Sequence, residues 1–291
     1  GSPSSVSALS TSEQIYQGGY KTTSDAANEG LYQDITVTAG DDWVVRAVAH
    51  SDSTSIPKII LYDQSNTAEI GSLTGTSSSD KDDPDVLILT GEAPSGCTTL
   101  RVKLVNTQSS GTAYWHQVEV LPNLNTDPSF ESGSGDPWIP TGWTNYGIDA
   151  GEALQGTDVH SGSSSFEMNG FTSLEQLGES STLTGGSYYV RGGFMKIDSS
   201  YTYLSRYNND FDKEVHQYLS SGSGHISFTD SSWTHKATVL RIDSQPGFPS
   251  TSIIPRVSTA DGKVDDVYLL SLDSVTLTVT QLNRQVRSLL E

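Results

Sequence analysis

The sequence is poor in cysteine, in positive charge and in long apolar runs. A single cysteine, Cys97, among 291 residues excludes an internal disulfide and a cysteine-based zinc site, and its turn-like surroundings predict a small buried thiol. Because 16 Lys and Arg residues stand against 35 Asp and Glu, the basic stripe that nucleic acid requires is missing. No segment approaches the roughly 18 apolar residues of a membrane helix. We therefore expect neither nucleic-acid binding nor membrane insertion.

The sequence also lacks the motifs of common enzyme classes. It contains no G-x-S-x-G elbow, P-loop, dinucleotide fingerprint or H-E-x-x-H pair, and its 6 histidines are scattered without metal-ligand spacing. Many carboxylates stand in Ser/Asp/Gly stretches such as residues 77–85, where solvated turns are the ordinary state. We expect a protein without catalytic activity.

Short apolar runs separated by Ser, Thr and Gly fill the chain instead. Apolar and polar residues alternate over residues 31–38, which predicts a strand with one buried face. Five more runs at similar spacing predict further strands, over residues 43–48, 59–62, 86–89, 100–105 and 114–120. This spacing is typical of an all-β sandwich.

The second half of the chain repeats the plan of the first. Residues 35–47 align with residues 181–193, so that Trp43 falls opposite Tyr189. Residues 100–120 align with residues 254–270 in the same order. We infer a tandem duplication of one β-sandwich.

Four parts follow from this alignment. Residues 1–13 are a polar tail in which Gly1-Ser2 reads as a cloning remnant, residues 14–122 form a diverged sandwich, and residues 123–273 form the second sandwich. Residues 274–291 carry apolar side chains at heptad steps and are expected to form a short C-terminal helix. Folding back on the sandwich and assembling a homo-oligomer through residues 275–291 fit this pattern equally.

Four motifs follow one another in the second half. They read Asn125 with Phe130-Glu131, Thr141-Gly142-Trp143, His160 to Ser165, and Asp265-Asp266-Val267. In this order they resemble carbohydrate-binding modules of the family 4/9 type, which are galactose-binding-like jelly-roll β-sandwiches. The resemblance covers residues 123–273 and is weaker for residues 14–122, where Tyr114-Trp115 replaces the aspartate pair.

The resemblance implies a structural calcium ion at one end of the second sandwich. In such modules an acidic residue of the first strand and one of the last strand meet, and loop carbonyls complete an oxygen shell. Carried over to this chain, the ligands are Glu131, Asp265 or Asp266, and a backbone oxygen near Ser163. Adjacent residues of a strand point to opposite faces, so one aspartate is expected to ligate. In the alternative, these carboxylates only accept hydrogen bonds from turn amides.

Sugar recognition needs flat aromatic faces with polar groups at the rim. Such residues gather in the second half, mostly in the weakly patterned segment 199–220, whereas Trp143, Tyr189 and Trp233 stand at strand positions that predict core packing. The first half gives no comparable cluster. The candidate ligand-binding residues are Trp138, Tyr146, Tyr201, Tyr203, Arg206, Tyr207 and Tyr218.

Two functions fit these observations. The first is non-catalytic binding of a neutral polysaccharide or cell-surface glycan by the second sandwich, within a larger extracellular, cell-surface or virion protein. The formal net charge of -19 suits a neutral ligand or a cation. The alternative is an architectural role, in a fibre or decoration protein of a phage virion or bacterial surface, without glycan binding of its own.

Overall fold

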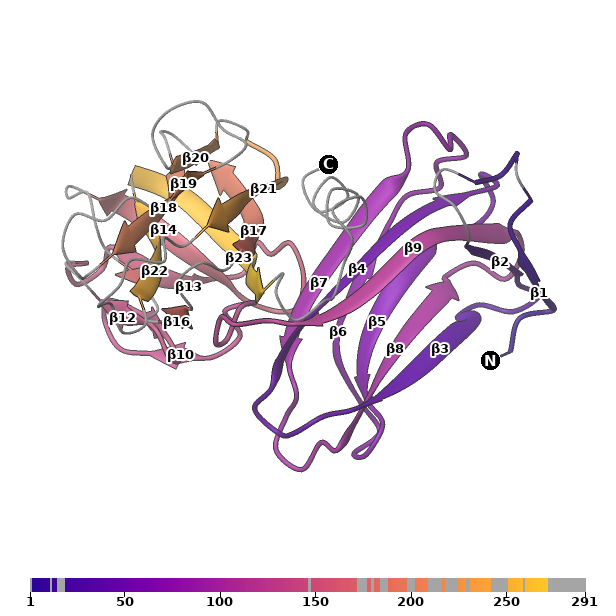
Figure 1. The fold of residues 1–291 in the computed structure, drawn as a ribbon, viewed down its shortest axis with the longest axis horizontal. Coiled ribbons are helices and arrows are strands. Elements are labelled where there is room, and N and C mark those ends of the chain that lie inside the picture. Colours follow the sequence, from indigo (N-terminus) through magenta and orange to yellow (C-terminus); the bar gives the residue numbers. More distant parts are fainter. Residues whose placement is uncertain are drawn as a thin grey trace. The chain divides into compact units, whose positions relative to one another are not determined.

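The structure is a computed structural model, and all its described regular elements are β-strands (Figure 1). It describes residues 2–10, 12–14, 19–145, 148–171, 177–178, 181–183, 188–197, 202–208, 216–217, 225–228, 231–241, 251–258 and 260–271. The expected all-β class is therefore confirmed for these residues, and none of them belongs to a helix that could cross a membrane. The heptad-patterned residues 274–291 lie outside the described part. The chain divides into two compact units, Gly1–Pro122 and Asn123–Glu291.

The first unit consists of two antiparallel sheets. The five-stranded sheet has the order β1 (Ser5–Ala8), β2 (Tyr20–Thr23), β9 (Thr112–Pro122), β4 (Asp42–Ser51) and β7 (Asp85–Glu92). The four-stranded sheet has the order β3 (Glu29–Thr36), β8 (Thr99–Asn106), β5 (Pro57–Asp63) and β6 (Ala68–Thr74). All six strands predicted in this half are present, and β1, β2 and β6 are additional.

Alternation along these strands builds the core of the first unit. Val45 and Ala47 of β4 pack with Ile59 and Leu61 of β5, so the core draws on both sheets. Cys97 belongs to the same cluster, and burial raises the pKa of its thiol. The predicted buried thiol is confirmed, and its raised pKa disfavours the reactive thiolate.

The second unit also has two large antiparallel sheets, together with a short β10–β11 ribbon (Gly133–Ser134 and Ile139–Pro140). One six-stranded sheet has the order β13 (Ala153–Gly156), β14 (Ser165–Phe171), β23 (Ala260–Ser271), β17 (Tyr188–Ile197), β21 (Thr234–Arg241) and β19 (His216–Gln217). The other contains β12 (Thr144–Asn145), β15 (Leu177–Gly178), β22 (Thr251–Ser258), β18 (Thr202–Asn208) and β20 (His225–Phe228), and β16 (Ser181–Leu183) also pairs with β22.

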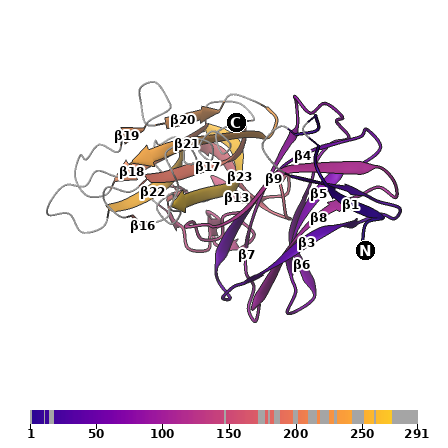
Figure 2. The ribbon, with the colours of Figure 1, turned by 45° about the vertical axis from the view of Figure 1, so that its right-hand side comes forward.

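The two units share a plan of strand pairing. In the first, β4 lies between β9 and β7, and in the second, β17 lies between β23 and β21 (Figure 2). In the other sheets, β3 pairs with β8 and β16 pairs with β22. Trp43 and Tyr189 occupy the beginnings of β4 and β17. The alignment that led us to infer a duplication therefore corresponds to equivalent strands.

Candidate functional site

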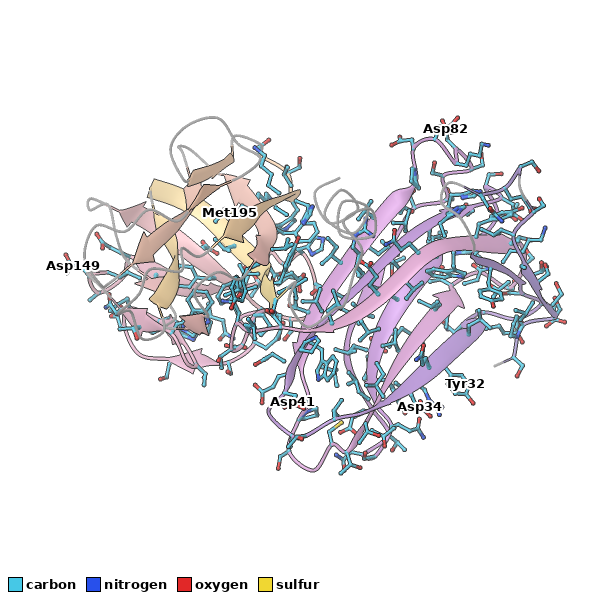
Figure 3. All side chains as sticks on the ribbon, viewed as in Figure 1. Tyr32, Asp34, Asp41, Asp82, Asp149 and Met195 are labelled. Atoms are coloured by element: carbon cyan, nitrogen blue, oxygen red, sulfur yellow. The ribbon has the colours of Figure 1, made fainter. Side chains whose placement is uncertain are left out.

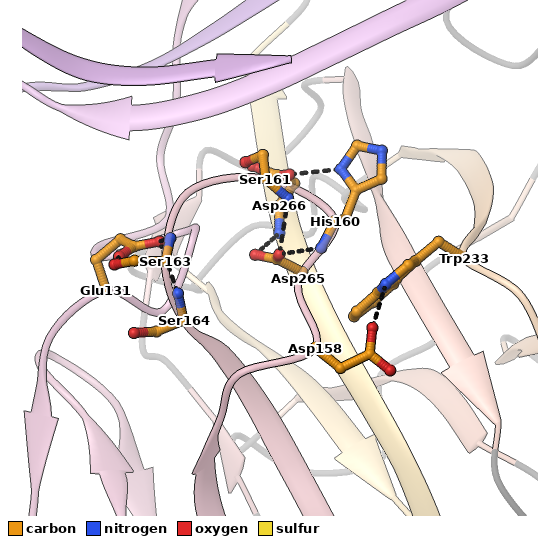
Figure 4. Close-up of polar contacts among 9 residues, drawn as sticks. All are labelled: Glu131, Asp158, His160, Ser161, Ser163, Ser164, Trp233, Asp265 and Asp266. Atoms are coloured by element: carbon orange, nitrogen blue, oxygen red, sulfur yellow. Dashed lines mark hydrogen bonds and ion pairs between the residues drawn. The ribbon is translucent and has the colours of Figure 1, made fainter. Parts of the chain in front are cut away.

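The described part of the second unit contains an acidic node made of Glu131, Asp265 and Asp266. One loop, residues 158–164, contacts all three of these acids (Figure 4). The backbone N–H groups of His160 and Ser161 donate to Asp265 Oδ2 over 2.8 and 3.1 Å. The loop thereby ties the beginning of the unit to its last strand, β23.

Glu131 is held by the far end of the same loop. The N–H groups of Ser163 and Ser164 donate to Glu131 Oε1 over 2.8 and 3.2 Å, and the Ser163 hydroxyl donates to Oε2. Gly162 makes this turn with a φ of 65°, in the left-handed region that favours glycine. A Cβ at this position would overlap the Glu131 carboxylate. The His-Ser-Gly turn of the sequence is thus the element that brings donors to Glu131.

Both aspartates of the node reach the same loop residue. Asp266 has a φ of 46°, and the pairing of β17 with β23 shifts register between Gly192 and Phe194. Asp266 Oδ2 lies 2.6 Å from His160 Nδ1, while Asp265 accepts the His160 backbone N–H. Strict alternation would have sent the two side chains to opposite faces. The irregular pairing beside Asp266 explains why both aspartate side chains can reach His160.

The node is electrostatically unusual because its acids are buried. Asp265 has no exposed surface, and this burial, followed by the neighbouring Asp266 charge, raises the pKa of Asp265 well above its usual range. Burial also raises the pKa of Asp127 to about 6, although its carboxylate accepts the N–H groups of Glu131 and Ser132. An environment of this kind favours proton or cation binding.

The chemistry of the node suits a hard cation in one respect and not in another. The atoms of the node that could bind a cation are mainly carboxylate and hydroxyl oxygens. The buried Ser161 hydroxyl has no hydrogen-bond partner among the described residues. However, no three His, Cys, Asp or Glu side chains in the described part could together hold a metal ion. Glu131 and Asp265 already accept backbone N–H groups. A calcium shell would therefore need backbone carbonyls for most of its ligands, and the ion stays a prediction.

The candidate sugar-binding residues are not gathered at one described place. Trp138 is only 8% exposed and packs against Phe166 with ring centroids 6.2 Å apart, so it is a core residue and offers no open face. Tyr203, Arg206 and Tyr207 belong to β18, whose strand pairing is described but whose side chains are not. The candidates outside the described residues are Tyr146, Tyr201 and Tyr218.

Two of the three aromatic residues predicted in the core are buried there. Trp143 is 6% exposed and donates its indole N–H to the Thr126 carbonyl over 2.8 Å, and Tyr189 is also buried. Trp233 is half-buried, and its indole N–H lies 3.3 Å from Asp158 Oδ1. Trp233 is thus partly solvent-accessible.

The first unit contains a groove that the sequence did not indicate. It has a volume of about 730 Å³, which is in the usual range for small-ligand sites, and is lined by residues of β1, β2, β4 and β9 on one side and β3 and β8 on the other. Tyr20, Trp43 and Trp115 all line it. These aromatic residues were expected to form no cluster. Their convergence depends on the pairing of β2 with β9, which places Tyr20 directly opposite Trp115.

The groove is uncharged. The described residues that line it include no Asp, Glu, Lys or Arg, and the polar ones are Gln33, His116 and Gln117. His116 Nε2 lies 2.6 Å from His50 Nδ1, and burial lowers the pKa of His116 to about 4. The imidazole of His116 is therefore neutral near pH 7.

No protein-family model and no curated protein sequence matches the chain. Among solved structures it is similar to the CBM22-1-CBM22-2 tandem domain of Paenibacillus barcinonensis Xyn10C, with 13% identity, 93% of each chain covered and a TM-score of 0.37. It is also similar to TmCBM61 in complex with beta-1,4-galactotriose, with 10% identity, 40% of this chain and 81% of that chain covered, and a TM-score of 0.32. The CUB1-EGF-CUB2 domain of human MASP-1/3 matches with 10% identity, 87% and 99% coverage and a TM-score of 0.17. These low scores assign no role to any residue.

Proposed function

We propose that this protein binds a neutral carbohydrate without catalysing a reaction. The observation that carries the proposal is the acidic node, where the loop of residues 158–164 joins Glu131 to Asp265 and Asp266. Three of the four motifs that resemble carbohydrate-binding modules thus meet in space, although more than 100 residues separate Glu131 from Asp265 along the chain. The fourth, at Trp143, packs with Phe130 in the same unit at a ring-centroid distance of 5.3 Å.

The burial and hydrogen bonding of Glu131, Asp265 and Asp266 support a structural role for these acids and not a catalytic one. Glycoside hydrolysis needs two carboxyl groups that face the substrate from opposite sides of the bond to be cleaved. Asp265 and Asp266 have no exposed surface, and both oxygens of Glu131 accept hydrogen bonds from the loop. These acids therefore hold the chain together and are not open to a substrate.

Affinity electrophoresis of the full chain in gels that contain neutral polysaccharides tests the proposal. We expect retardation by at least one neutral polysaccharide and none by an acidic one, because the net charge of -19 repels polyanions. Tyr203→Ala and Tyr207→Ala test the predicted aromatic contacts on β18. Tyr62→Ala is a matched control, because Tyr62 belongs to β5 of the first unit and lies outside the groove lining.

The absence of retardation by any neutral polysaccharide would reject the proposal and favour the architectural alternative. That alternative depends on residues 275–291, which lie outside the described residues, and no described contact favours it. The extracellular, cell-surface or virion location stays a prediction.

A further inference from the structure

We propose that the first unit has a ligand site of its own, in which the groove between its two sheets binds a neutral oligosaccharide. The site is independent of β18 and of the acidic node, which belong to the second unit. It therefore does not rest on the mode of binding proposed for that unit.

The first step is that the sandwich is open along one side. Strand β1 ends the five-stranded sheet and β3 ends the four-stranded sheet, so each has one hydrogen-bonded neighbour among the described strands. Both strands line the groove, through Val6 of β1 and Leu31, Gln33 and Ile35 of β3. No described strand closes the sandwich between these two edges.

The second step is that core-facing positions are left uncovered there. Val118 pairs with Ala47 and Gln33 pairs with Val102, and both partners are buried in the core of the unit. Directly opposed residues of paired strands share a face. Val118 and Gln33 therefore face the space between the sheets, yet both are exposed, Val118 by 38%.

The same reasoning applies to strands β1 and β2, which lie on the same wall of the groove as Val118. Tyr20 pairs with the buried Trp115, and Val6 pairs with Thr22, which pairs in turn with the buried Ala113. Tyr20 is nevertheless 56% exposed and Val6 is 47% exposed. Apolar groups turned toward a core but left open to water mark a binding surface more strongly than scattered apolar residues do.

The third step is the chemistry of the lining, which selects the class of ligand. The rings of Tyr20 and Trp43 suit the C–H face of a pyranose, and the exposed amide of Gln33 can bond its hydroxyls. The described lining has no charged side chain to recognise an ionic ligand. A purely aliphatic ligand would displace water from the exposed Gln33 amide without replacing its hydrogen bonds, which costs binding free energy. A neutral ligand that is both apolar and hydroxylated fits best.

Trp43 provides a separate indication. Its indole N–H is buried and has no hydrogen-bond acceptor among the described residues, although the residue lines the groove. Most buried indole N–H groups have a partner. A hydroxyl oxygen of a bound sugar is the kind of acceptor that this N–H lacks.

An added peptide strand is the main competing occupant, and the edge of β3 disfavours it. Figure 3 shows Tyr32 and Asp34 projecting from this strand. Asp34 forms a two-pronged ion pair with Arg101, at 2.6 and 2.7 Å, and the Arg101 guanidinium lies 3.8 Å from the Tyr32 ring centroid. Charged groups on an edge strand oppose the addition of another strand. Strand β1 is only four residues long, which limits pairing on the other side.

Isothermal titration of the full chain with a panel of neutral oligosaccharides of three to six sugar units tests the site. We expect Tyr20→Ala to weaken the binding of the best ligand by about tenfold, because it removes an exposed ring from the wall. Val118→Asp should abolish binding, because it places a charge in the apolar groove. Leu154→Asp is the matched control, since Leu154 is 41% exposed on β13 of the second unit. Near-UV circular dichroism verifies that each variant is folded.

Weaker binding by Tyr20→Ala and loss of binding by Val118→Asp, with unchanged binding by Leu154→Asp, would support the site. Equal binding in all four proteins would overturn it and leave the proposed carbohydrate binding intact, whereas no binding by the wild type would remove both. Binding of decanoate without any sugar would show an acyl-chain site and overturn the inference. A wild-type dimer that Val118→Asp dissociates, measured by light scattering, would do the same, because a second copy would then occupy the groove.

Discussion

Gly162 illustrates how one residue determines whether the acidic node can form. Its φ of 65° lies in the left-handed region, and a Cβ there would overlap the Glu131 carboxylate. The turn that it makes directs the N–H groups of Ser163 and Ser164 to Glu131. Glycine is therefore required here for two reasons, backbone conformation and space.

We expect Gly162→Ala to destabilise the second unit by more than the roughly 1–2 kcal/mol cost of a left-handed alanine. The additional loss arises because the methyl group displaces Glu131 from its donors. Gly151→Ala is the control, because Gly151 has a φ of 80° but nothing within 4 Å of an added Cβ. Urea unfolding measures both variants. An equal decrease in the free energy of unfolding for both variants would mean that the contact with Glu131 does not contribute to stability.

Asp127 makes a second residue-scale prediction, because burial raises its pKa to about 6. A folded-state pKa above the unfolded value of about 3.9 favours folding at low pH. This contribution is lost as the pH rises from about 4 to about 6. We expect Asp127→Asn, which cannot ionise, to gain stability relative to the wild type as the pH rises through this window.

Urea unfolding of the two proteins at pH 4 and pH 7 measures that difference. Comparing variant with wild type removes the contribution of the many other carboxylates, since both proteins carry them. A difference that stays constant with pH would contradict the raised pKa. Asp52→Asn in the first unit is a suitable control, because the pKa of Asp52 is lowered by hydrogen bonds from Thr54 and Thr112 despite the opposing effect of burial. The contribution of Asp52 is therefore lost only as the pH falls below about 4, so between pH 4 and pH 7 the difference between Asp52→Asn and the wild type should change little.

Single residues also show the limit of sequence reasoning about sites. The backbone N–H of Trp138 donates to the Ala153 carbonyl over 3.0 Å, a contact between distant segments that places the indole against Phe166. An aromatic residue in a loop gives no sign of such a contact, so its assignment to a sugar surface was wrong. Tyr20 was passed over for the same reason, since only the pairing with β9 places it opposite Trp115.

At the scale of elements, alternation and repeats predicted most of the first unit. The strands with strong apolar runs, such as β4 and β5, were found because their core faces are continuous. Strands β1 and β2 are four residues long, and a period cannot be recognised over so short a stretch. The register shift beside Asp266 was also missed, because it depends on the partner strand β17. The groove could not be predicted from the sequence, because two of the strands that line it, β1 and β2, were not recognised.

The acidic node connects Glu131 and the loop of residues 158–164 to β23. We propose that bound calcium would make this connection more stable. If Glu131, Asp265 and backbone oxygens hold Ca²⁺, calcium should raise the melting temperature of the second unit and EDTA should lower it. An excess of one hundred times Kd stabilises the bound state by about 2.7 kcal/mol. Differential scanning calorimetry of the full chain, with and without calcium, measures the shift.

Glu131→Gln is the control for the calcium proposal. It keeps an oxygen acceptor for the N–H groups of Ser163 and Ser164 but removes the charge. The calcium-dependent shift should shrink in this variant while the calcium-free stability changes less. A melting temperature that responds to neither calcium nor EDTA would leave the node as a set of amide-bound carboxylates without an ion.

For the whole molecule, the decisive contrast is between its charge and its groove. The chain carries a formal net charge of -19, yet the described groove residues include no charged side chain. Long-range repulsion therefore selects against acidic ligands, while the groove itself recognises shape, apolar faces and hydroxyls. Together they predict selectivity for neutral glycans without electrostatic attraction.

This contrast makes the affinity for a neutral oligosaccharide insensitive to salt. Between 50 and 500 mM NaCl the Debye length falls from roughly 14 to roughly 4 Å, which would weaken an attraction between exposed charges strongly. We expect the Kd measured by isothermal titration to change by less than about twofold over this range, because ring stacking and neutral hydrogen bonds are not screened. The matched test adds Lys to the groove as Val118→Lys and offers a uronic-acid oligosaccharide, whose binding should then appear and weaken as salt rises. A steep salt dependence of the wild type with a neutral sugar would show that charged residues outside the groove make the contacts, and would move the binding surface away from the space between the sheets.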